Sequence, residues 1–180
     1  MTVIVALTGL ARAGKDTAAD ILAKKGFVKL VFSDFLKEEV RKRNLELNKM
    51  NLSIVGDELR AKHGRGVLAK YLWEKAKNYS RVVAVGVRSP EEADYLREKA
   101  EKFLLIEISA KPEIRFQRRS DADPQTFEEF MRRDERDIKN KGLAEVLKMA
   151  DVKIDNNGTI AELEERIVNT LRENEIEVMK

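Results

Sequence analysis

The sequence predicts an α/β fold in which a five-stranded parallel sheet is covered by helices on both faces. Two observations lead to this class. Five short segments rich in apolar residues alternate with longer segments of helical periodicity, and strands that are apolar throughout are typical of sheets buried between two helical layers. The first strand also runs directly into a glycine-rich loop and a helix. The predicted strands span residues 3–7, 27–32, 81–87, 103–108 and 152–155.

Helical patterns fill the segments between these strands. The first helix stops at Gly26, since glycine ends helices readily. Ser33 and Asp34 are predicted to cap the second helix, and residues 44–53 form a looser stretch after it. The other helical patterns span residues 14–25, 55–77 with an interruption at Gly64 and Gly66, 90–102, 112–119, 125–139, 143–149 and 159–174.

Composition restricts the classes of function. The 180 residues give one domain, 1–180, with a sizeable core. The absence of cysteine excludes disulfides, thiolate catalysis and cysteine metal sites, and the single His63 excludes a multi-histidine metal site. A net charge of +3 is too small to argue for nucleic acid. No apolar run approaches the roughly 18 residues of a membrane span and no signal peptide is visible, so we expect a cytoplasmic protein. We expect it to be a monomer or a homodimer.

The most specific motif lies between the first strand and the first helix. The template of a phosphate-binding loop is Gly, four residues, Gly, Lys, then Ser or Thr, and Gly9, Gly14 and Lys15 fit it. Glycine permits the dihedral angles that turn backbone N–H groups toward phosphate oxygens, and the helix start adds its positive dipole end. Lys15 supplies a charge for the β and γ phosphates. The expected nucleotide contacts here are Gly9, Ala11, Arg12, Ala13, Gly14, Lys15, Asp16 and Thr17.

One position of this loop departs from the template. Asp16 stands where most such loops carry the hydroxyl residue that binds magnesium, and the hydroxyl follows one place later as Thr17. Asp34 comes just after the second strand, where it could bind magnesium through water or take a proton from an acceptor. A helix cap is the compatible alternative for Asp34. The candidate metal residues are therefore Asp16, Thr17 and Asp34.

Basic residues near the third strand suggest an acceptor site. Arg88 follows that strand at the carboxyl edge of the sheet, where such folds bind ligands, and its guanidinium suits an acceptor phosphate. The alternative for Arg88 is a surface residue that opens a loop. Within a predicted acceptor-binding insertion of about residues 34–78, Arg60 and Arg65 could also bind the acceptor, whereas His63 is more readily interpreted as solvent-exposed.

Arginines on both sides of the polar segment 120–124 suggest a small hinged lid over about residues 112–136. Closure of such a lid would bring positive charge to the triphosphate and exclude water. The alternative for Arg132 and Arg133 is an ordinary ion pair on the helix surface, because each stands four residues after a glutamate. The six arginines are Arg115, Arg118, Arg119, Arg132, Arg133 and Arg136, of which Arg119 and Arg133 are the leading candidates.

The turn after the last strand has two interpretations. Asn156, Asn157 and Gly158 follow that strand at the carboxyl edge, where a backbone turn can pack on a nucleotide base. Asparagine and glycine are also the residues that tolerate left-handed dihedral angles in a turn with no ligand. We leave both interpretations open.

With these motifs the chain resembles the nucleoside-monophosphate-kinase branch of the P-loop kinases over nearly its full length. GLARAGKDTAAD and GFVKLVFSDFLKEE are similar to the deoxynucleoside monophosphate kinases of phages. The later segments resemble an archaeal adenylate-kinase-related group, with dephospho-CoA kinases more distant; these segments are VGVRSPEEADYLRE, RRSDADPQTFEEFMRRDERD and ADVKIDNNGTIAELEERI.

The resemblance implies an adenylate-kinase-like P-loop NTPase fold with a core, an acceptor site and a lid. It also implies ATP and Mg²⁺ as cofactors and phosphoryl transfer to a nucleoside or deoxynucleoside monophosphate. The residues expected to act in catalysis are Lys15, Asp34, Arg88, Arg119 and Arg133. The donor contacts expected outside the loop are Arg115, Arg119, Asn157 and Gly158.

One departure from the family pattern weakens the expected metal site. The family usually ends its third strand with Asp-Gly and uses this aspartate to hold magnesium, whereas this chain has Val85 and Gly86. The carboxylate that holds magnesium would then come from Asp34 or Asp16.

Three alternatives to a nucleoside-monophosphate kinase remain. They are a dephospho-CoA-kinase-like small-molecule kinase, a nucleotide-binding regulator with slow ATP hydrolysis, and, more weakly, a nucleic-acid-binding protein, for which the sequence shows no aromatic stacking platform.

Overall fold

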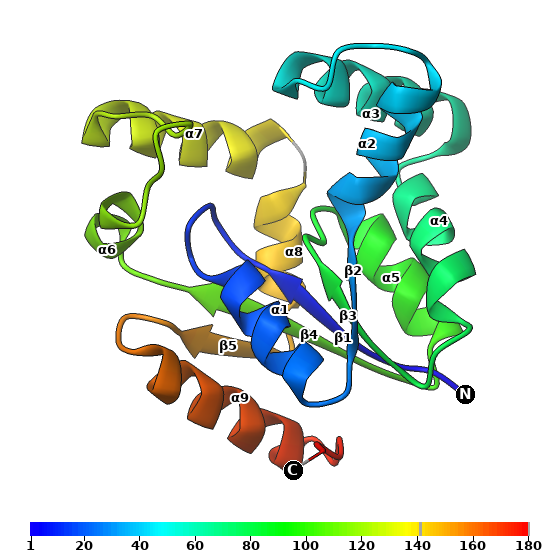
Figure 1. Ribbon diagram of the computed structural model, residues 1–180, viewed down its shortest axis with the longest axis vertical. Helices are drawn as coiled ribbons and strands as arrows, with labels where there is room; N and C mark the ends of the chain where they lie inside the picture. Colours follow the sequence, from blue (N-terminus) through cyan, green and yellow to red (C-terminus); the bar gives the residue numbers. More distant parts are fainter. Residues whose placement is uncertain (141, 180) are drawn as a thin grey trace.

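The computed structural model describes residues 1–140 and 142–179, and within them five parallel strands form one sheet (Figure 1). The strand order is β2-β3-β1-β4-β5, so the predicted fold class is confirmed. β1 is central, because Ala6 pairs with Ala84 of β3 on one side and with Leu105 of β4 on the other. The loop after β1 therefore emerges in the middle of the carboxyl edge. The strands are β1 Val3–Thr8, β2 Val28–Val31, β3 Arg81–Val85, β4 Lys102–Ser109 and β5 Val152–Asp155.

Helices cover both faces of this sheet (Figure 1). α1 and α9 cover one face, and α4, α5 and α8 cover the other. Among the described residues, no helix combines the length and apolar character needed to cross a membrane. The helices are α1 Lys15–Lys24, α2 Phe32–Lys42, α3 Lys49–His63, α4 Val67–Ala76, α5 Pro90–Lys99, α6 Pro112–Gln117, α7 Phe127–Asn140, α8 Leu143–Met149 and α9 Ile160–Glu173.

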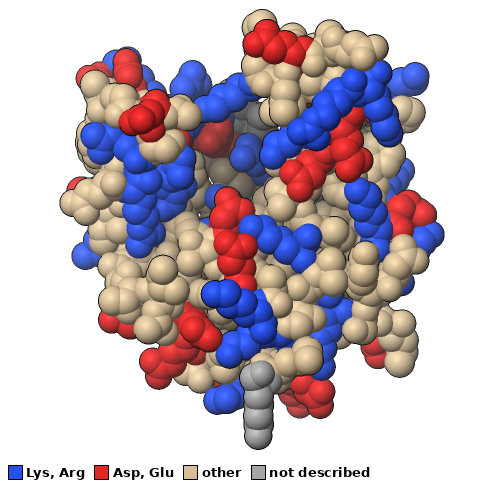
Figure 2. Space-filling model, in the orientation of Figure 1, with Lys and Arg blue, Asp and Glu red and all other residues tan. Residues whose placement is uncertain are grey.

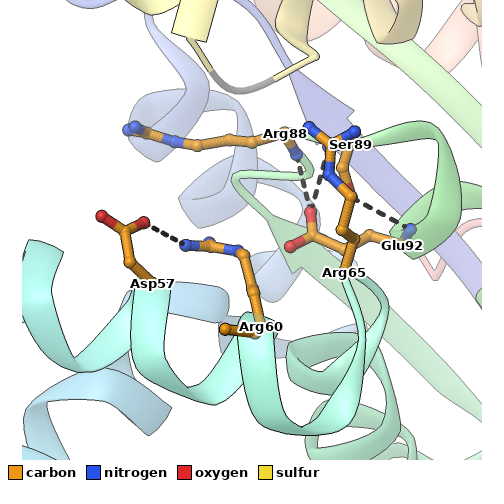
Figure 3. Close-up of a pocket in the computed structure, with 7 residues that line it drawn as sticks. Asp57, Arg60, Arg65, Arg88, Ser89 and Glu92 are labelled. Atoms are coloured by element: carbon orange, nitrogen blue, oxygen red, sulfur yellow. Dashed lines mark hydrogen bonds and ion pairs between the residues drawn. The ribbon is translucent and has the colours of Figure 1, made fainter.

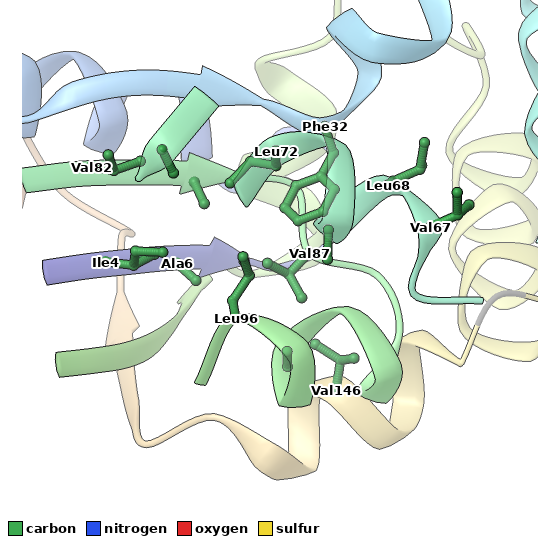
Figure 4. Close-up of a cluster of buried hydrophobic side chains, with 14 of the residues drawn as sticks. Ile4, Ala6, Phe32, Val67, Leu68, Leu72, Val82, Val87, Leu96 and Val146 are labelled. Atoms are coloured by element: carbon green, nitrogen blue, oxygen red, sulfur yellow. The ribbon is translucent and has the colours of Figure 1, made fainter. Parts of the chain in front are cut away.

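Two hydrophobic cores fix the central strand in register. Ile4 and Ala6 belong to the cluster under α4, α5 and α8 (Figure 4), whereas Val5 and Leu7 belong to the cluster under α1 and α9. All four side chains are fully buried. Since side chains alternate between the faces of a strand, a shift by one residue would exchange the two cores. The position of the loop that follows β1 is fixed in this way.

The structure corrects the expected looseness of residues 44–53. Helix α3 already begins at Lys49, and Asn48 caps it by accepting a hydrogen bond from the backbone N–H of Asn51 at 2.8 Å. Asparagine is a favoured N-cap residue. The local signal was therefore present in the sequence, about two turns before the predicted start of the helix at residue 55.

The expected cap of the second helix is also wrong. Helix α2 begins at Phe32, with Val31 at the N-cap and no capping side chain, so Ser33 and Asp34 lie inside the first turn. Phe32 is buried in the core beneath this helix, and its packing continues the helix back to the end of β2. Asp34 nonetheless stays at the carboxyl edge of the sheet.

Two other predicted boundaries shift, and one prediction is confirmed. Strand β3 ends before Gly86, whose φ of 94° is a left-handed value that interrupts an extended strand. Helix α5 ends at Lys99, because Lys102 already pairs with Val3 in the sheet. The predicted interruption at Gly64 is confirmed: this residue ends α3 with a φ of 93°.

Candidate nucleotide and acceptor site

The glycines of the phosphate loop meet geometric requirements that other residues cannot. Gly9 has a φ of 145°, and a Cβ atom there would lie 2.2 Å from the carbonyl oxygen of Ile108. Gly14 has a φ of 108°, and a Cβ atom there would lie 2.2 Å from Nδ2 of Asn156. Arg12, between them, has a left-handed φ of 64°. The loop is thus wrapped tightly before α1, with the helix N-terminus at its end.

Lys15 lies across this loop and is short of negative partners. Its Nζ donates to the carbonyl oxygens of Gly9 at 2.8 Å and Leu10 at 3.0 Å. Burial, together with the positive charge of Arg88, lowers the pKa of Lys15 to about 8, although the charges of Asp16 and Asp137 act in the opposite direction. The site is therefore deficient in negative charge, which a phosphate would supply.

This pKa predicts how nucleotide use depends on pH. We expect kcat/KM for ATP to fall as the pH rises through about 8, because the neutral amine cannot offset phosphate charge. Bound phosphate favours the protonated amine, so kcat at saturating ATP should persist to higher pH. Arg88→Met should move the kcat/KM inflection upward, since one neighbouring cation is removed. A kcat/KM profile that is flat across pH 8 would contradict this assignment.

The predicted metal residues lie around the start of α1 and α2. The Asp16 side chain is 82 % exposed and its carboxylate lies 3.5 Å from Lys29 Nζ, while Asp34 pairs with Lys37 at 3.3 Å. Among the described residues, no three His, Cys, Asp or Glu side chains cluster closely enough to form a metal site alone. Magnesium in phosphoryl-transfer sites uses one or two carboxylates plus substrate phosphates and water. Asp16, Thr17 and Asp34 fit such a sparse ligand set.

The turn after β5 contacts the phosphate loop directly. Asn156 is buried, and its Nδ2 donates to the carbonyl oxygen of Ala13 at 2.9 Å. Arg118 joins the same two segments, because it donates to the carbonyl oxygens of Asn156 at 2.7 Å and Ala13 at 3.3 Å. Asn157 and Gly158 are exposed beside it. Arg118, which was not a leading candidate in the sequence, is therefore placed at the predicted base-binding turn.

Arg115 is placed differently from the prediction. Its side chain and that of Asp134 are each only 3 % exposed, and Nη2 donates to Oδ2 of Asp134 at 2.8 Å. The same guanidinium donates to the carbonyl oxygens of Ala110 at 3.1 Å and Ala11 at 3.3 Å. Arg115 thus ties α6, α7 and the phosphate loop together from inside, instead of presenting its guanidinium to a donor nucleotide.

The remaining lid arginines divide between surface and interior. Arg119 is half-buried, with its guanidinium 4.0 Å from the centre of the Phe116 ring. Arg132 forms the expected surface pair with Glu128. Arg133 instead turns inward, where Nη1 donates to Oδ1 of Asp123 at 2.5 Å. The expected surface alternative therefore holds for Arg132, and Arg133 belongs to the interior of the lid.

A pocket of about 280 Å³ lies beyond β3, between α3 and the start of α5 (Figure 3). Arg60 comes from α3, Arg65 from the connection after it, and Arg88 from the loop after β3. The carboxylate of Asp57 lies 3.8 Å from Arg60 on the same helix. Three arginines from three segments make this pocket suited to an anionic acceptor. His63 is exposed and does not line it.

A buried carboxylate holds the loop that carries Arg88. Glu92 accepts hydrogen bonds from the backbone N–H of Arg88 at 2.8 Å and of Ser89 at 3.3 Å, and Ser89 Oγ accepts from the backbone of Glu92. Burial raises the pKa of Glu92, partly opposed by these hydrogen bonds and by the charge of Arg60. Ser89 and Glu92 form a capping box, which fixes the start of α5 and the position of the Arg88 backbone.

The surface is hollowed between the predicted lid and the predicted acceptor-binding insertion (Figure 2). Figure 2 shows basic side chains on both sides of this hollow, between the lid around α6 and α7 and the helices α2 and α3. The two sides approach each other where Lys49 Nζ donates to the carbonyl oxygen of Ala122 at 3.5 Å. The described conformation therefore brings the lid segment against the predicted acceptor-binding insertion.

The fold and the loop together define a P-loop nucleotide-binding domain of the α/β class. A family model described as an AAA domain matches residues 5–142. The chain is 34% identical to a UPF0200 protein of Methanothrix thermoacetophila over 94% of this chain and 97% of the relative, and 35% identical to one of Thermococcus kodakarensis over 91% and 94%. The chain belongs to the UPF0200 family.

Solved structures with the same fold include small-molecule kinases. A shikimate kinase of Bacteroides thetaiotaomicron aligns with a TM-score of 0.63 and 16% identity over 94% of this chain and 98% of that one. A gluconokinase of Sinorhizobium meliloti aligns with a TM-score of 0.54 and 15% identity over 96% and 93%. At these identities the likeness concerns the fold alone. The P-loop part of the predicted resemblance is thereby confirmed, and the acceptor stays a prediction.

Proposed function

We propose that the protein is an ATP-dependent kinase that transfers a phosphoryl group to a small anionic acceptor, with a nucleoside or deoxynucleoside monophosphate as the first candidate. The observation that carries this proposal is the proximity of two cationic subsites. Lys15 follows β1 and Arg88 follows the neighbouring strand β3, and the two segments are joined where Thr8 Oγ1 donates to the carbonyl oxygen of Val87 at 2.8 Å. A donor phosphate and an acceptor anion bound at these residues would face each other.

In this mechanism the protein acts by positioning and by electrostatic stabilisation. The backbone N–H groups of the loop and Lys15 would bind the β and γ phosphates, while Arg60 and Arg88 would orient the acceptor anion. Arg119 and Arg133 would offset charge on the moving phosphoryl group. Magnesium, when bound, would neutralise phosphate charge, and Asp34 would accept a proton from the acceptor group.

A regulatory ATPase is the second candidate, and Val85 favours it. This side chain is buried at the end of β3, where the resembled family places an aspartate. A weaker metal site would slow phosphoryl transfer while leaving nucleotide binding at the loop intact. Such a protein would release ADP from ATP slowly and at a rate independent of any acceptor.

Substitution of Arg88 tests the proposed acceptor subsite. We expect Arg88→Met to raise KM for the acceptor by about 10-fold or more, because one charge-assisted hydrogen bond of roughly 1.5–3 kcal/mol is lost. The KM for ATP should change far less. Arg97→Met is a matched control, since Arg97 also belongs to the α5 region but pairs with Asp151 on the surface. Equal effects of both substitutions on the acceptor KM would contradict the assignment.

A further inference from the structure

Asp123 of the lid segment accepts hydrogen bonds from three residues, Arg12, Ser120 and Arg133. Arg12 Nε donates to its Oδ2 at 2.6 Å and Arg133 Nη1 to its Oδ1 at 2.5 Å. The backbone N–H of Ser120 donates at 2.8 Å and its hydroxyl at 3.2 Å. The Asp123 side chain is 8 % exposed. One carboxylate is therefore surrounded by donors, two of them cationic.

The two cations come from different parts of the molecule. Arg12 belongs to the phosphate loop and has a left-handed φ of 64°, whereas Arg133 belongs to α7. Burial alone would raise the pKa of Asp123, but the hydrogen bonds from Arg133, Ser120 and Arg12 outweigh it and hold this pKa far below the usual range. The aspartate is thus ionised at any physiological pH, and it links the loop to the lid as a permanent anion.

Arg133 keeps unused hydrogen-bonding capacity in this arrangement. Its Nε and Nη2 atoms are buried and have no hydrogen-bond partner among the described residues. The guanidinium lies 4.7 Å from the centre of the Phe130 ring, which supports it from one side. Buried donors without acceptors are rare in native proteins, because an unpaired buried polar group is costly. A phosphate oxygen bound near the loop would supply the missing acceptor.

We propose that Asp123 is a positioning residue that clasps Arg12 of the phosphate loop to Arg133 of the lid, so that Arg133 is held beside the loop to offset the charge of the phosphoryl group in transfer. This inference rests on the proposed kinase function. Without the negative charge of Asp123, the guanidinium groups of Arg12 and Arg133 would repel each other. The lid would then lose its contact with Arg12. Asp123 itself touches neither donor nor acceptor.

The isosteric substitution Asp123→Asn tests the clasp by separating kcat from KM. It keeps the shape of the side chain and removes the charge. We expect kcat to fall roughly 10- to 100-fold, as for a misplaced catalytic group, with KM for ATP nearly unchanged. Asp121→Asn is the matched control, because Asp121 is an exposed aspartate of the same segment. A merely structural Asp123 would instead lower the melting temperature and leave the kcat of the folded fraction unchanged, which would overturn the proposal.

A double-mutant cycle and hydrogen exchange complete the test. The effects of Arg12→Ala and Asp123→Asn on kcat should be strongly non-additive, whereas additive effects would overturn the clasp.

If the wild type shows no acceptor-dependent turnover, the kinase proposal fails by itself. The clasp is then decided by amide hydrogen exchange of residues 120–133 in the wild-type protein with ADP. Protection lost in Asp123→Asn and retained in Asp121→Asn supports it, and equal protection in both variants overturns it.

Discussion

Replacing Lys15 with alanine is expected to lower the kcat of acceptor-dependent ADP release by about 10²–10³-fold, the usual effect of removing a group that stabilises transition-state charge. The Lys15 side chain crosses the phosphate loop, with its Nζ 2.8 Å from the Gly9 carbonyl oxygen. Its positive charge therefore lies where the donor phosphates are expected to bind. The fold should survive the change. Since burial lowers the pKa of Lys15 to about 8, the protonated amine is disfavoured in the native state and its removal relieves that cost.

The control for this substitution is a lysine of the same region without contact to the loop. Lys25 follows α1 and forms a surface pair with Glu164 at 3.2 Å. Lys25→Ala should leave kcat within a small factor of the wild type, and the melting temperatures of both variants should stay close to that of the wild type. Retention of most of the activity by Lys15→Ala would show that the loop does not act on phosphate.

Asp134→Ala is expected to destabilise the protein by about 3–5 kcal/mol, because it leaves Arg115 as a buried charge without its ion-pair partner. Both side chains are nearly inaccessible, and their nitrogen and oxygen atoms are 2.8 Å apart. For a domain of this size the melting temperature should fall by roughly 10 °C. Chemical denaturation of the purified variant measures the loss of unfolding free energy directly.

A surface pair on the same helix provides the comparison. Arg132 and Glu128 also form an ion pair on α7, but at solvent-exposed positions, so Arg132→Ala should cost only about 0–1 kcal/mol. If Asp134→Ala cost no more than that while strongly raising KM for ATP, Arg115 would be a nucleotide ligand, as first predicted from the sequence, instead of an internal tie between α6 and α7.

The sequence predicted the features that depend on short-range pattern. The apolar strands and the glycine-rich loop follow from residue order alone, because strand burial and loop dihedral angles are local requirements. Arg88 was predicted to bind an acceptor for the same reason, since it directly follows a strand at the carboxyl edge, and it lines the pocket beyond β3. The structure places Arg60 and Arg65 in the same pocket. The strand order, with β1 in the centre, had to come from the structure.

The partners of the lid arginines could not be predicted in this way. Arg12 and Asp123 are separated by 111 positions, and no spacing rule connects them. Arg115 looked like a phosphate ligand because nothing local shows that Asp134 would bury it. The charge of Asp137 near Lys15 was missed for the same reason, because α7 had first to be placed over the loop.

The most direct test of the proposed kinase is the rate of ADP release from magnesium-ATP, measured alone and with each acceptor of a panel. The panel comprises AMP, CMP, UMP, GMP, their deoxy forms, dTMP and dephospho-CoA. The proposal predicts strong stimulation by at least one acceptor, formation of its phosphorylated product, and loss of both in Lys15→Ala. Slow, Lys15-dependent release that no acceptor stimulates would contradict it and would favour the regulatory ATPase.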